Sequence, residues 1–505
     1  MTARPNIPPT AATFAAQIPY AFAKSHGVLA AGMEGDAVVV LTRPDATADG
    51  VVEIKRVLQR PLVTRAIGAD AFAFELARAY NQAAPTATTT LADDLARETD
   101  LARLMQDMPV TEDLLDSTTQ APVIRMINAL LLQALRERAS DLHFEPYEAR
   151  SVVRFRIDGV LRDVIEPPRA LHAALVSRLK IMANLDIAEK RLPQDGRIAL
   201  KLGDKQVDVR VSTLPTGSGE RVVLRLLDKD SAHLDLTALG MSEPIRDAID
   251  GLIREPHGIV LVTGPTGSGK TTTLYASLSR LPRGAVNMMT VEDPIEYALD
   301  GVAQTQVNPR IELDFARTLR AILRQDPDVI MIGEIRDLET AQIAVQASLT
   351  GHLVLATLHT NDATSAVTRL ADMGVESYLL ASSLLGVLAQ RLVRTLCPVC
   401  RASQAPSTGE RKLLDGLGLP ASQPVWTAPG CDECNHTGFR GRTGVYELLL
   451  IDDAMRRHIH DGTSELALRA AATGAGMTSL RRDGARLLAD GTTSLAELLR
   501  VTRDA

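Results

Sequence analysis

Residues 258–278 read GIVLVTGPTGSGKTTTLYASL, and this stretch decides how the rest of the chain is interpreted. An apolar run is followed by a glycine-rich turn and then by a helix-favouring segment. The turn fits the pattern GxxxxGK[ST] in the strand–turn–helix setting that the pattern requires, which argues against a chance match. Its glycines let backbone N–H groups close around phosphates, while a lysine neutralises charge and a threonine can bind Mg²⁺. The stretch therefore predicts an ATP-binding loop made of Gly264, Pro265, Thr266, Gly267, Ser268, Gly269, Lys270, Thr271 and Thr272.

Size and charge narrow the class of protein. The chain has 505 residues, more than one hydrophobic core usually serves, so about two to four domains are expected. The 55 basic and 62 acidic residues give a net charge of -7, and no long basic run occurs, so nucleic acid is not an expected partner. No segment approaches about 18 consecutive apolar residues, and the first residues lack the apolar core of a secretion signal. We therefore expect a cytoplasmic protein whose membrane contacts are peripheral.

Changes of composition along the chain predict three domains. Residues 1–80 are expected to form a small α/β domain, and the small, polar residues of 81–104 are typical of a linker. Residues 105–230 are expected to form a mixed α/β domain. From 236–505, apolar strands alternate with helical segments, as in a parallel sheet with crossover helices. The predicted fold class is α/β and multidomain, with the nucleotide-binding domain last.

The middle domain is predicted in more detail. A helix is expected from Pro122 onward, because proline suits a first helical turn and apolar residues recur at helical spacing after it. The segment SVVRFRIDGVLRDV alternates apolar and polar residues and turns at Asp158-Gly159, which predicts a hairpin. VDVRVS and RVVLRLL continue the strand pattern across a glycine-rich loop.

A carboxylate is expected beside the phosphate loop. In DPDVIMIGEIRD (326–337), Glu334 closely follows an apolar strand, so it should emerge at the carboxyl end of the sheet, where it could orient an attacking water. Gly333 stands where many phosphate-binding ATPases carry an aspartate for Mg²⁺. The metal would then depend on Thr271, the phosphates, water and the acidic segment at 290–297. The alternative for Glu334 is a helix cap or a salt bridge to Arg336.

The segment TVEDPIEY (290–297) is the second acidic candidate. Its carboxylates, Glu292, Asp293 and Glu296, surround Pro294 and repel one another unless a cation or arginines lie opposite. A solvated loop would explain them equally well.

Two histidines flank the apolar strand in TGHLVLATLHTNDA (350–363). His352 and His359 are each candidates for structural hydrogen bonding or for a nucleotide sensor. If His359 reaches the γ-phosphate, it can report whether ATP or ADP is bound.

Phosphoryl transfer also needs positive charge where charge spreads in the transition state. The candidates are Arg210, Arg225, Arg320, Arg324 and Arg336. An arginine on another domain or subunit could complete the site only when the two close together. Solvation or pairing with acids is the alternative for each of them.

All four cysteines fall in two CxxC pairs, CPVC and CDEC, which are separated by 30 residues. The ligands Cys397, Cys400, Cys431 and Cys434 can present four thiolates to one structural Zn²⁺. Two redox-active pairs are the alternative, and His436 is a possible but unneeded ligand.

The motifs, in this order, resemble the type II secretion ATPases within the secretion ATPase superfamily. The matching segments are IPYAFAKSHGVL, ASDLHFEP with RFRIDGVL, RLPQDGRI, GPTGSGKTTT, TVEDPIEY, DPDVIMIGEIRD, TGHLVLATLHTNDA, the paired CxxC and GFRGRTGVYELL. The resemblance covers nearly the whole length and implies a RecA-like motor domain, joined to the middle domain, in a hexamer that binds ATP between domains and subunits.

The resemblance also implies roles for individual residues. It implies that Glu334 is the catalytic glutamate and that glycine at 333 is the family's own pattern. It implies catalytic or sensing roles for Lys270, Glu292, Glu296, His352 and His359, and nucleotide contacts across domains for Arg210 and Arg225.

The resemblance further implies a function at the membrane. The N-terminal domain would dock on the cytoplasmic part of inner-membrane secretion protein L, with protein F as a second partner, and hold the motor peripherally at the inner membrane. ATP turnover would drive pseudopilus assembly and export of folded proteins. A type IV pilus assembly ATPase is the nearest alternative, but the IPYAFAKSHGVL start and the length favour secretion. Intact Lys270 and Glu334 argue against a non-hydrolysing, nucleotide-gated scaffold.

Overall fold

The structure is a computed structural model that describes residues 14, 18, 20–69, 71–72, 75–76, 79, 117–202, 205–228 and 235–502. The chain divides into two units between Asp230 and Ser231, and each is described by itself. The predicted linker at 81–104 lies outside the described residues, as does the predicted start of the middle domain. In the part of the chain that the structure describes, no helix combines the length and the apolar character needed to cross a lipid bilayer.

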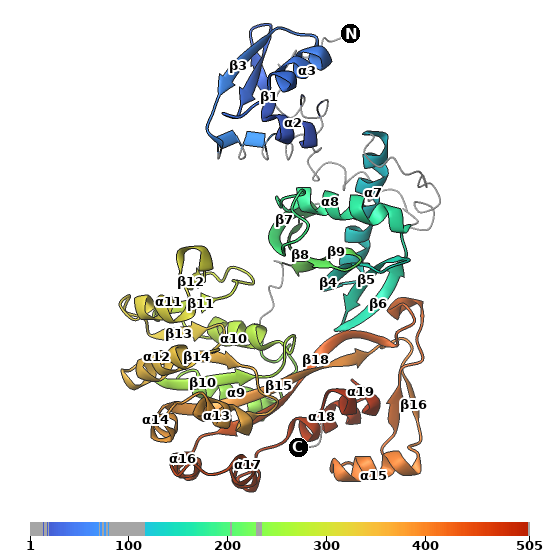
Figure 1. Cartoon of the computed structure of the whole chain (residues 1–505). Helices are drawn as coiled ribbons and strands as arrows, with labels where there is room; N and C mark the ends of the chain where they lie inside the picture. The colour runs from blue at the N-terminus through green and yellow to red at the C-terminus, as the bar shows by residue number, and fades with distance from the viewer. Residues whose placement is uncertain are drawn as a thin grey trace. The chain divides into compact units, whose positions relative to one another are not determined.

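The N-terminal part of the first unit is a small α/β arrangement (Figure 1). Within the described residues it has strands β1 (Val28–Glu34), β2 (Ala37–Thr42) and β3 (Leu62–Ala66), with helices α2 (Tyr20–His26) and α3 (Ala48–Leu58). β1 and β2 form an antiparallel hairpin, whereas β3 pairs parallel to β2 after the crossover through α3. Thr47 caps α3 by accepting a hydrogen bond from the N–H of Gly50 at 3.3 Å.

The rest of the first unit contains an antiparallel sheet with the order β6-β5-β4-β9-β8-β7 in the described residues. Its elements are α7 (Ser117–Arg136), β4 (Asp141–Pro146), β5 (Ser151–Ile157), β6 (Val160–Ile165), η1 (Arg169–Leu171), α8 (His172–Met182), β7 (Gln194–Leu202), β8 (Lys205–Thr216) and β9 (Gly219–Asp228). Leu142 and Phe144 pack with α7 and α8 in one core. The predicted hairpin is confirmed: Asp158 and Gly159, with φ of 49° and 84°, join β5 to β6 in a two-residue turn.

The predicted start of the first long helix was wrong. Helix α7 begins at Ser117, five residues earlier, and Pro122 lies inside it. Proline has no N–H to donate there, so one helical hydrogen bond is lost. A buried apolar stripe offsets this cost, because each fully buried aliphatic side chain contributes about 1.5–3 kcal/mol. The stripe is Val123, Met126, Ile127, Leu130, Leu131 and Ala134.

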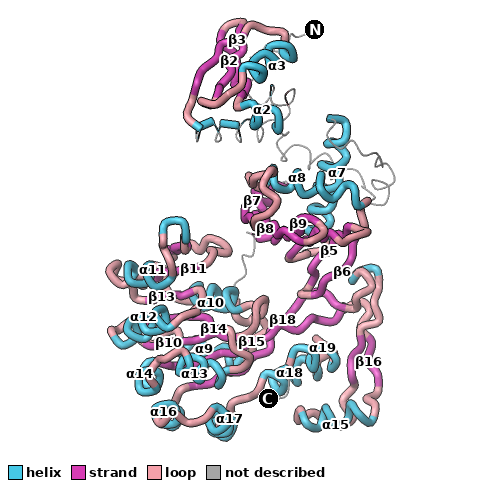
Figure 2. Tube along the Cα trace, viewed as in Figure 1, coloured by secondary structure: helices cyan, strands magenta, loops and turns pink. Residues whose placement is uncertain are grey.

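The second unit is built on a sheet with the order β12-β11-β13-β14-β10-β15-β18 in the described residues (Figures 1 and 2). Neighbouring strands are parallel from β12 to β15, and β18 runs antiparallel at the edge. The strands are β10 (Gly258–Thr263), β11 (Met288–Glu292), β12 (Ala303–Gln306), β13 (Val329–Ile332), β14 (Leu353–Leu358), β15 (Leu384–Leu396) and β18 (Phe439–Leu450). This arrangement confirms the predicted fold class.

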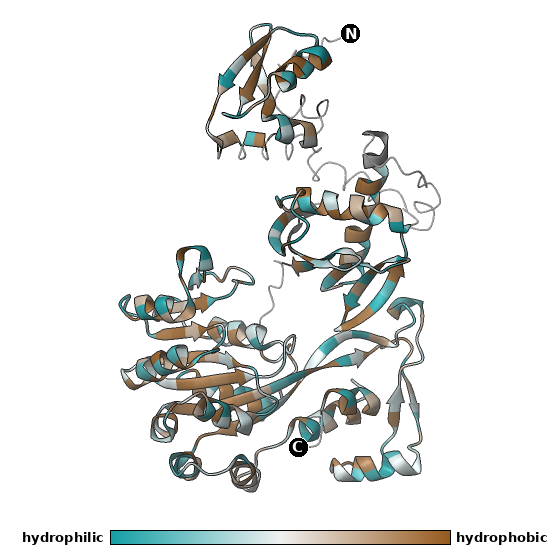
Figure 3. Cartoon of the chain, viewed as in Figure 1, coloured by the Kyte–Doolittle hydropathy of each residue, from teal (hydrophilic) through white to brown (hydrophobic). Residues whose placement is uncertain are grey.

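Helices cover both faces of this sheet. Ile259 and Leu261 of β10 share a core with the helices of one face, whereas Val260 and Val262 share a core with those of the other. The first face carries α11 (Phe315–Ile322), α12 (Leu338–Leu349), α13 (Ala363–Asp372), α14 (Ser377–Ser383), α16 (Asp453–His460) and α17 (Glu465–Gly474), and the second carries α9 (Glu243–Leu252) and α10 (Lys270–Ser279). Burial on both faces explains why the strands read as continuous apolar runs, which Figure 3 shows in brown.

Strands β15 and β18 continue as an antiparallel ribbon that carries the cysteine loop. The pairing runs from Gly386↔Leu450 to Leu396↔Phe439. The loop contains β16 (Ala402–Gln404), α15 (Thr408–Gly416), β17 (Val425–Thr427) and η3 (Asp432–Cys434), and a short helix η2 (Pro309–Ile311) lies elsewhere in this unit. The last helices, α18 (Leu480–Ala489) and α19 (Leu495–Val501), pack on the ribbon through a separate apolar cluster.

A buried ion pair fastens α19 to the ribbon. The carboxylate of Glu497, with 1% of its side chain exposed, contacts Arg394 of β15 at 2.8 Å and Arg500 at 2.7 Å. Burial opposes ionisation of this carboxyl, but the hydrogen bonds from Arg500 and Arg394 prevail and lower its pKa to about 2.

Candidate nucleotide-binding site and metal centre

The phosphate loop joins the end of β10 to the start of α10, where the sequence predicts it. Gly264, Gly267 and Gly269 have φ of 149°, 77° and 86°, which side chains other than glycine rarely adopt. At Gly264 a Cβ would come within 2.5 Å of the carbonyl oxygen of Gln390. These glycines therefore allow the backbone to wrap closely, as a phosphate-binding turn requires.

Lys270 lies inside this loop. Its Nζ donates to the carbonyl oxygens of Gly264 at 2.8 Å and Pro265 at 3.1 Å. Burial lowers the pKa of Lys270 to about 8, although the negative charge of Glu334 partly opposes this shift. The buried hydroxyl of Ser268 has no hydrogen-bond partner among the described residues. An unpartnered hydroxyl and a buried ammonium on a glycine cradle fit a phosphate ligand, which would supply acceptors for both side chains.

Three neighbouring strand ends bring Glu334, His359 and Lys270 together. Strand β14 lies between β13 and β10, so His359 lies between the other two side chains. Its Nδ1 lies 3.4 Å from Lys270 Nζ, and its Nε2 lies 3.2 Å from Glu334 Oε2. An ammonium only donates and a carboxylate only accepts, so in this arrangement a neutral His359 carries its proton on Nε2. The three side chains thus form a continuous series of hydrogen bonds.

The position of Glu334 depends on further contacts. Its carboxylate pairs with Arg336, which also approaches Asp293 at 3.8 Å. The salt bridge considered from the sequence is therefore present, together with the placement beside the loop. The hydroxyl of Thr357 donates to the carbonyl of Gly333 at 2.6 Å, and this bond holds the turn before Glu334. The Glu334 side chain is 17% exposed, so water can reach it.

Glu292 is buried, so a solvated loop does not describe it. Its carboxylate accepts hydrogen bonds from the hydroxyl of Tyr275 on α10, from Thr290 Oγ1 at 2.5 Å and from Gln304 Nε2 at 3.0 Å. Burial and the neighbouring Glu292 raise the pKa of Tyr275, which therefore stays protonated and donates. Glu296 is half-buried, and its backbone N–H lies 3.4 Å from the same tyrosine hydroxyl. Glu292 thus links the helix after the phosphate loop to the central sheet.

Other predicted residues lie away from the loop within their own unit. His352 precedes β14, at the amino edge of the sheet, and its Nδ1 is 2.9 Å from the carbonyl oxygen of Ala347. The six residues of β14 separate it from His359, about 20 Å along the strand. Arg320 pairs with Glu339, and Arg324 Nη1 donates to the carbonyl of Arg320 at 2.7 Å. Inter-subunit roles for these side chains stay predictions.

Arg210 and Arg225 belong to the first unit. They lie opposite each other on β8 and β9, and Arg225 Nε is 2.9 Å from Asp141 Oδ1. Their contribution to nucleotide binding stays a prediction.

Sequence reasoning missed two buried residues that support the site. Thr357 holds the carbonyl of Gly333, and Gln390 contacts the phosphate loop. The one available signal for Gln390 was a polar side chain inside the apolar segment LLGVLAQRLV. Such residues need buried hydrogen-bond partners, but the sequence does not identify them.

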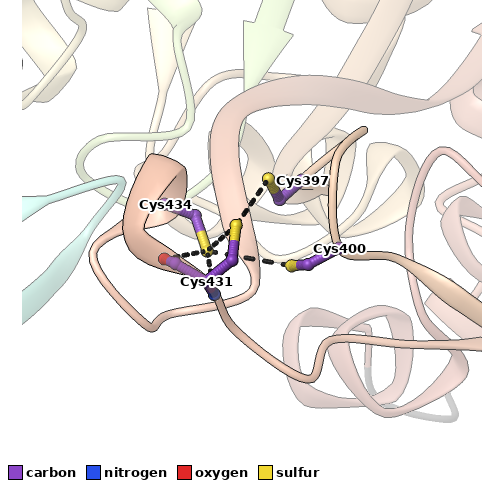
Figure 4. Close-up of side chains that lie close together, drawn as sticks. All are labelled: Cys397, Cys400, Cys431 and Cys434. Carbon is purple, nitrogen blue, oxygen red and sulfur yellow. Dashed lines mark hydrogen bonds between the residues drawn. The ribbon is translucent and has the colours of Figure 1, made fainter.

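The four cysteines meet at the tip of the ribbon (Figure 4). Their ligand atoms all lie within 4.8 Å of one another. Three Sγ–Sγ distances, 397 to 431, 400 to 434 and 431 to 434, are 3.9, 3.9 and 3.8 Å. A tetrahedron with Zn–S bonds of about 2.3 Å has edges of about 3.8 Å, whereas a disulfide is about 2.05 Å long. The cluster therefore has the dimensions of a zinc site.

One thiol of the cluster is already poised for ionisation. Burial opposes ionisation of Cys434, but the N–H groups of Cys431 and Gly438, at 3.2 and 3.1 Å from its sulfur, lower its pKa to about 6. His436 lies outside the cluster, 77% exposed and 3.2 Å from Asp432. The donor set is thus four sulfurs, which suits a closed structural site.

The fold of the motor unit is similar to that of solved secretion and pilus ATPases. The chain matches the pilus retraction motor PilT with bound ADP at a TM-score of 0.50 and 24% identity, covering 74% of this chain and 96% of PilT. It matches the Yersinia pseudotuberculosis ATPase DotB at a TM-score of 0.55 and 21% identity, covering 75% and 93% of the two chains. At these identities the similarity concerns the fold alone.

Sequence relatives are much more similar. The type II secretion system protein HxcR of Pseudomonas aeruginosa is 59% identical, over 97% of this chain and 99% of the relative. The type II secretion system protein E of Aeromonas hydrophila is 54% identical over 97% of both chains, and the type II secretion system ATPase E of Vibrio cholerae is 54% identical over 90% of both. The family model for the type II/IV secretion system protein matches residues 116–500, and that for the N-terminal domain of GSPII protein E matches 17–80. The chain therefore belongs to the type II/IV secretion system protein family, and within it to the type II secretion system E proteins.

Proposed function

We propose that this protein hydrolyses ATP and that its turnover drives type II secretion. The observation that carries the proposal is the series of hydrogen bonds from Lys270 through His359 to Glu334, at the carboxyl ends of three adjacent strands. It joins a phosphate-binding group to a carboxylate that water can reach. Family membership supports the same chemistry.

Each side chain has a defined task in this proposal. Backbone N–H groups of the loop bind the phosphates, and Lys270 turns from the loop carbonyls to the β- and γ-phosphates. Glu334 orients the attacking water, while Arg336 holds its carboxylate in place. His359, between them, transmits the presence of the γ-phosphate to Glu334. Glu292 and Tyr275 keep α10, and with it Lys270, fixed against the sheet.

Two metals fit the residues present. Thr271, in the first turn of α10, would hold Mg²⁺ together with the phosphates. Mg²⁺ would neutralise phosphate charge during transfer. The four cysteines would hold Zn²⁺ in a structural role and so close the loop that they flank.

We further propose a homo-hexamer at the cytoplasmic face of the inner membrane. Arg210 and Arg225 would approach nucleotide across domains or subunits, so that hydrolysis depends on assembly. The match of residues 17–80 to the N-terminal domain of GSPII protein E supports docking of this part on inner-membrane secretion protein L, with protein F as a second partner. It also favours secretion over pilus extension. Turnover would then drive pseudopilus assembly and export of folded proteins.

The test compares two substitutions in the full chain. Lys270→Ala is expected to abolish ATP binding, hydrolysis and secretion. Glu334→Gln should retain ATP binding while hydrolysis falls at least about 100-fold, because the water is no longer oriented. Exposed Gln342→Glu is the control. A wild-type hexamer that binds ATP and never consumes it would instead support the nucleotide-gated scaffold.

A further inference from the structure

Gln390 lies directly behind the phosphate loop. Strands β10 and β15 are parallel, and Thr263, the last residue of β10, pairs with Ala389. Gln390 is therefore the first residue of β15 beyond the end of β10, where the phosphate loop begins at Gly264. Its side chain is buried, with 2% of the residue exposed. A polar side chain with this degree of burial needs specific partners.

Both ends of the Gln390 amide are used. Its Nε2 donates to the backbone carbonyl of Ser268 in the loop at 2.6 Å, and its Oε1 accepts from Thr273 Oγ1 on α10 at 2.8 Å. A carbonyl can only accept, so the nitrogen must face Ser268, which fixes the orientation of the amide. The side chain thus bridges the sheet, the phosphate loop and the helix that follows it.

The hydrogen bond to Ser268 orients a peptide group of the loop. In a trans peptide the C=O and the following N–H point in opposite directions. Because the carbonyl of Ser268 faces Gln390, the N–H of Gly269 points away from Gln390, to the side on which this motif binds phosphates. Gly269, with φ of 86°, has the freedom to let this peptide rotate. The Gln390 amide therefore selects one of the orientations that the glycine allows.

We propose that Gln390 is a positioning residue that presets the Ser268–Gly269 peptide for binding nucleoside di- and triphosphates. This inference rests on the proposed nucleotide-binding function and adds a residue from β15 to that site. Backbone N–H groups of the loop contact the α- and β-phosphates. Gln390 therefore sets the affinity for ADP and ATP to the same extent, whereas Glu334 and His359 act at the γ-phosphate.

Gln390→Met tests this positioning role. Methionine has nearly the same length and fills the same space, but it makes neither hydrogen bond. We expect the Kd for ADP and for a non-hydrolysable ATP analogue to rise by the same factor, about 3- to 10-fold, the effect of one buried hydrogen bond. The KM for ATP should rise equally, while kcat stays within about twofold. Gln390→Glu keeps the acceptor for Thr273 but loses the donor to Ser268, so it should weaken binding at least as much.

Thr273→Val provides a second, milder test. It keeps the shape of the side chain but removes the hydroxyl that orients the Gln390 amide, so both Kd values should rise less than in Gln390→Met. It also keeps the proposal testable if Gln390→Met does not fold. Exposed Gln342→Glu on α12 serves as the control and should bind like wild type.

The outcomes separate the two proposals. If wild-type protein binds ADP and folded Gln390→Met binds it equally well, Gln390 only fills space and the positioning role is wrong. Loss of ATP affinity alone, with ADP unaffected, would also overturn it. If wild-type protein binds neither nucleotide, the proposed function itself fails, and this inference fails with it.

Discussion

Raising the pH from about 7 to about 9 is expected to weaken ATP binding roughly tenfold, through the titration of Lys270. The protein's own groups set the pKa of this buried ammonium to about 8. At pH 7 roughly nine tenths of the side chain is protonated, and at pH 9 roughly one tenth. The ammonium is the form that attracts phosphate, and phosphate raises its pKa again. Binding at pH 9 must therefore take up close to one proton, which costs about 1.4 kcal/mol of affinity.

The assay is isothermal titration calorimetry of ATP at both pH values, in pairs of buffers that differ in ionisation enthalpy. Lys270→Arg is the matched variant, because a guanidinium stays charged throughout this range. Its affinity is expected to be lower overall but to change little with pH. Equal affinity of the wild-type protein at both pH values would refute the reasoning, as would a tenfold loss that persists in Lys270→Arg.

The same pKa shift has a separate effect on folding. The folded-state pKa of Lys270 lies below the ordinary value of 10.5. The unfolded chain therefore holds more protons between about pH 8 and pH 10.5, so this side chain makes stability rise with pH across that window. The effect is specific to the protein without phosphate at the loop, because bound phosphate restores the charge.

Three further predictions concern stability. Replacing Cys397 and Cys431 by serine should abolish binding of one zinc ion per chain, measured by atomic emission, and lower the Tm; wild-type protein without zinc would contradict the metal assignment. Tyr275→Phe should lower the free energy of unfolding by about 1–3 kcal/mol in urea titrations, because buried Glu292 loses a donor; an unchanged midpoint would argue against that network. Glu497 has a folded-state pKa of about 2, below the usual 4.5, so its stabilisation, up to about 3 kcal/mol, is complete above pH 4.5 and lost as pH falls towards 2. Glu497→Gln should flatten this acid limb, and an identical limb would exclude the carboxylate as its source.

The parts of the structure that were predictable are those set by local sequence. The phosphate loop follows from a strand, a glycine turn and a helix within 21 residues, and the Asp158-Gly159 hairpin follows from two residues that tolerate positive φ. The start of α7 was missed because a proline signal outweighed the helical residues before it. Tertiary packing decided that boundary.

The contacts that assemble the site depend on sheet order, which local patterns do not encode. His352 and His359 look equivalent around one apolar run, yet strand direction places them at opposite edges of the sheet. Gln390 reaches the phosphate loop only because β15 pairs with β10, more than 120 residues away in sequence. Local patterns contain no measure of that pairing.

The ribbon of β15 and β18 gives the cysteine cluster a reach beyond its own loop. Cys397 directly follows the strand that carries Gln390, about 23 Å further along it, and Gln390 faces Tyr446 across the pairing. Sliding one strand past the other by a single residue would turn every side chain of β15 to the opposite face. The amide would then leave the nucleotide loop at one end while the thiolates separated at the other. A metal ion gripping the tip is thus a pin against slippage, and it keeps in alignment a hydrogen bond that it never touches.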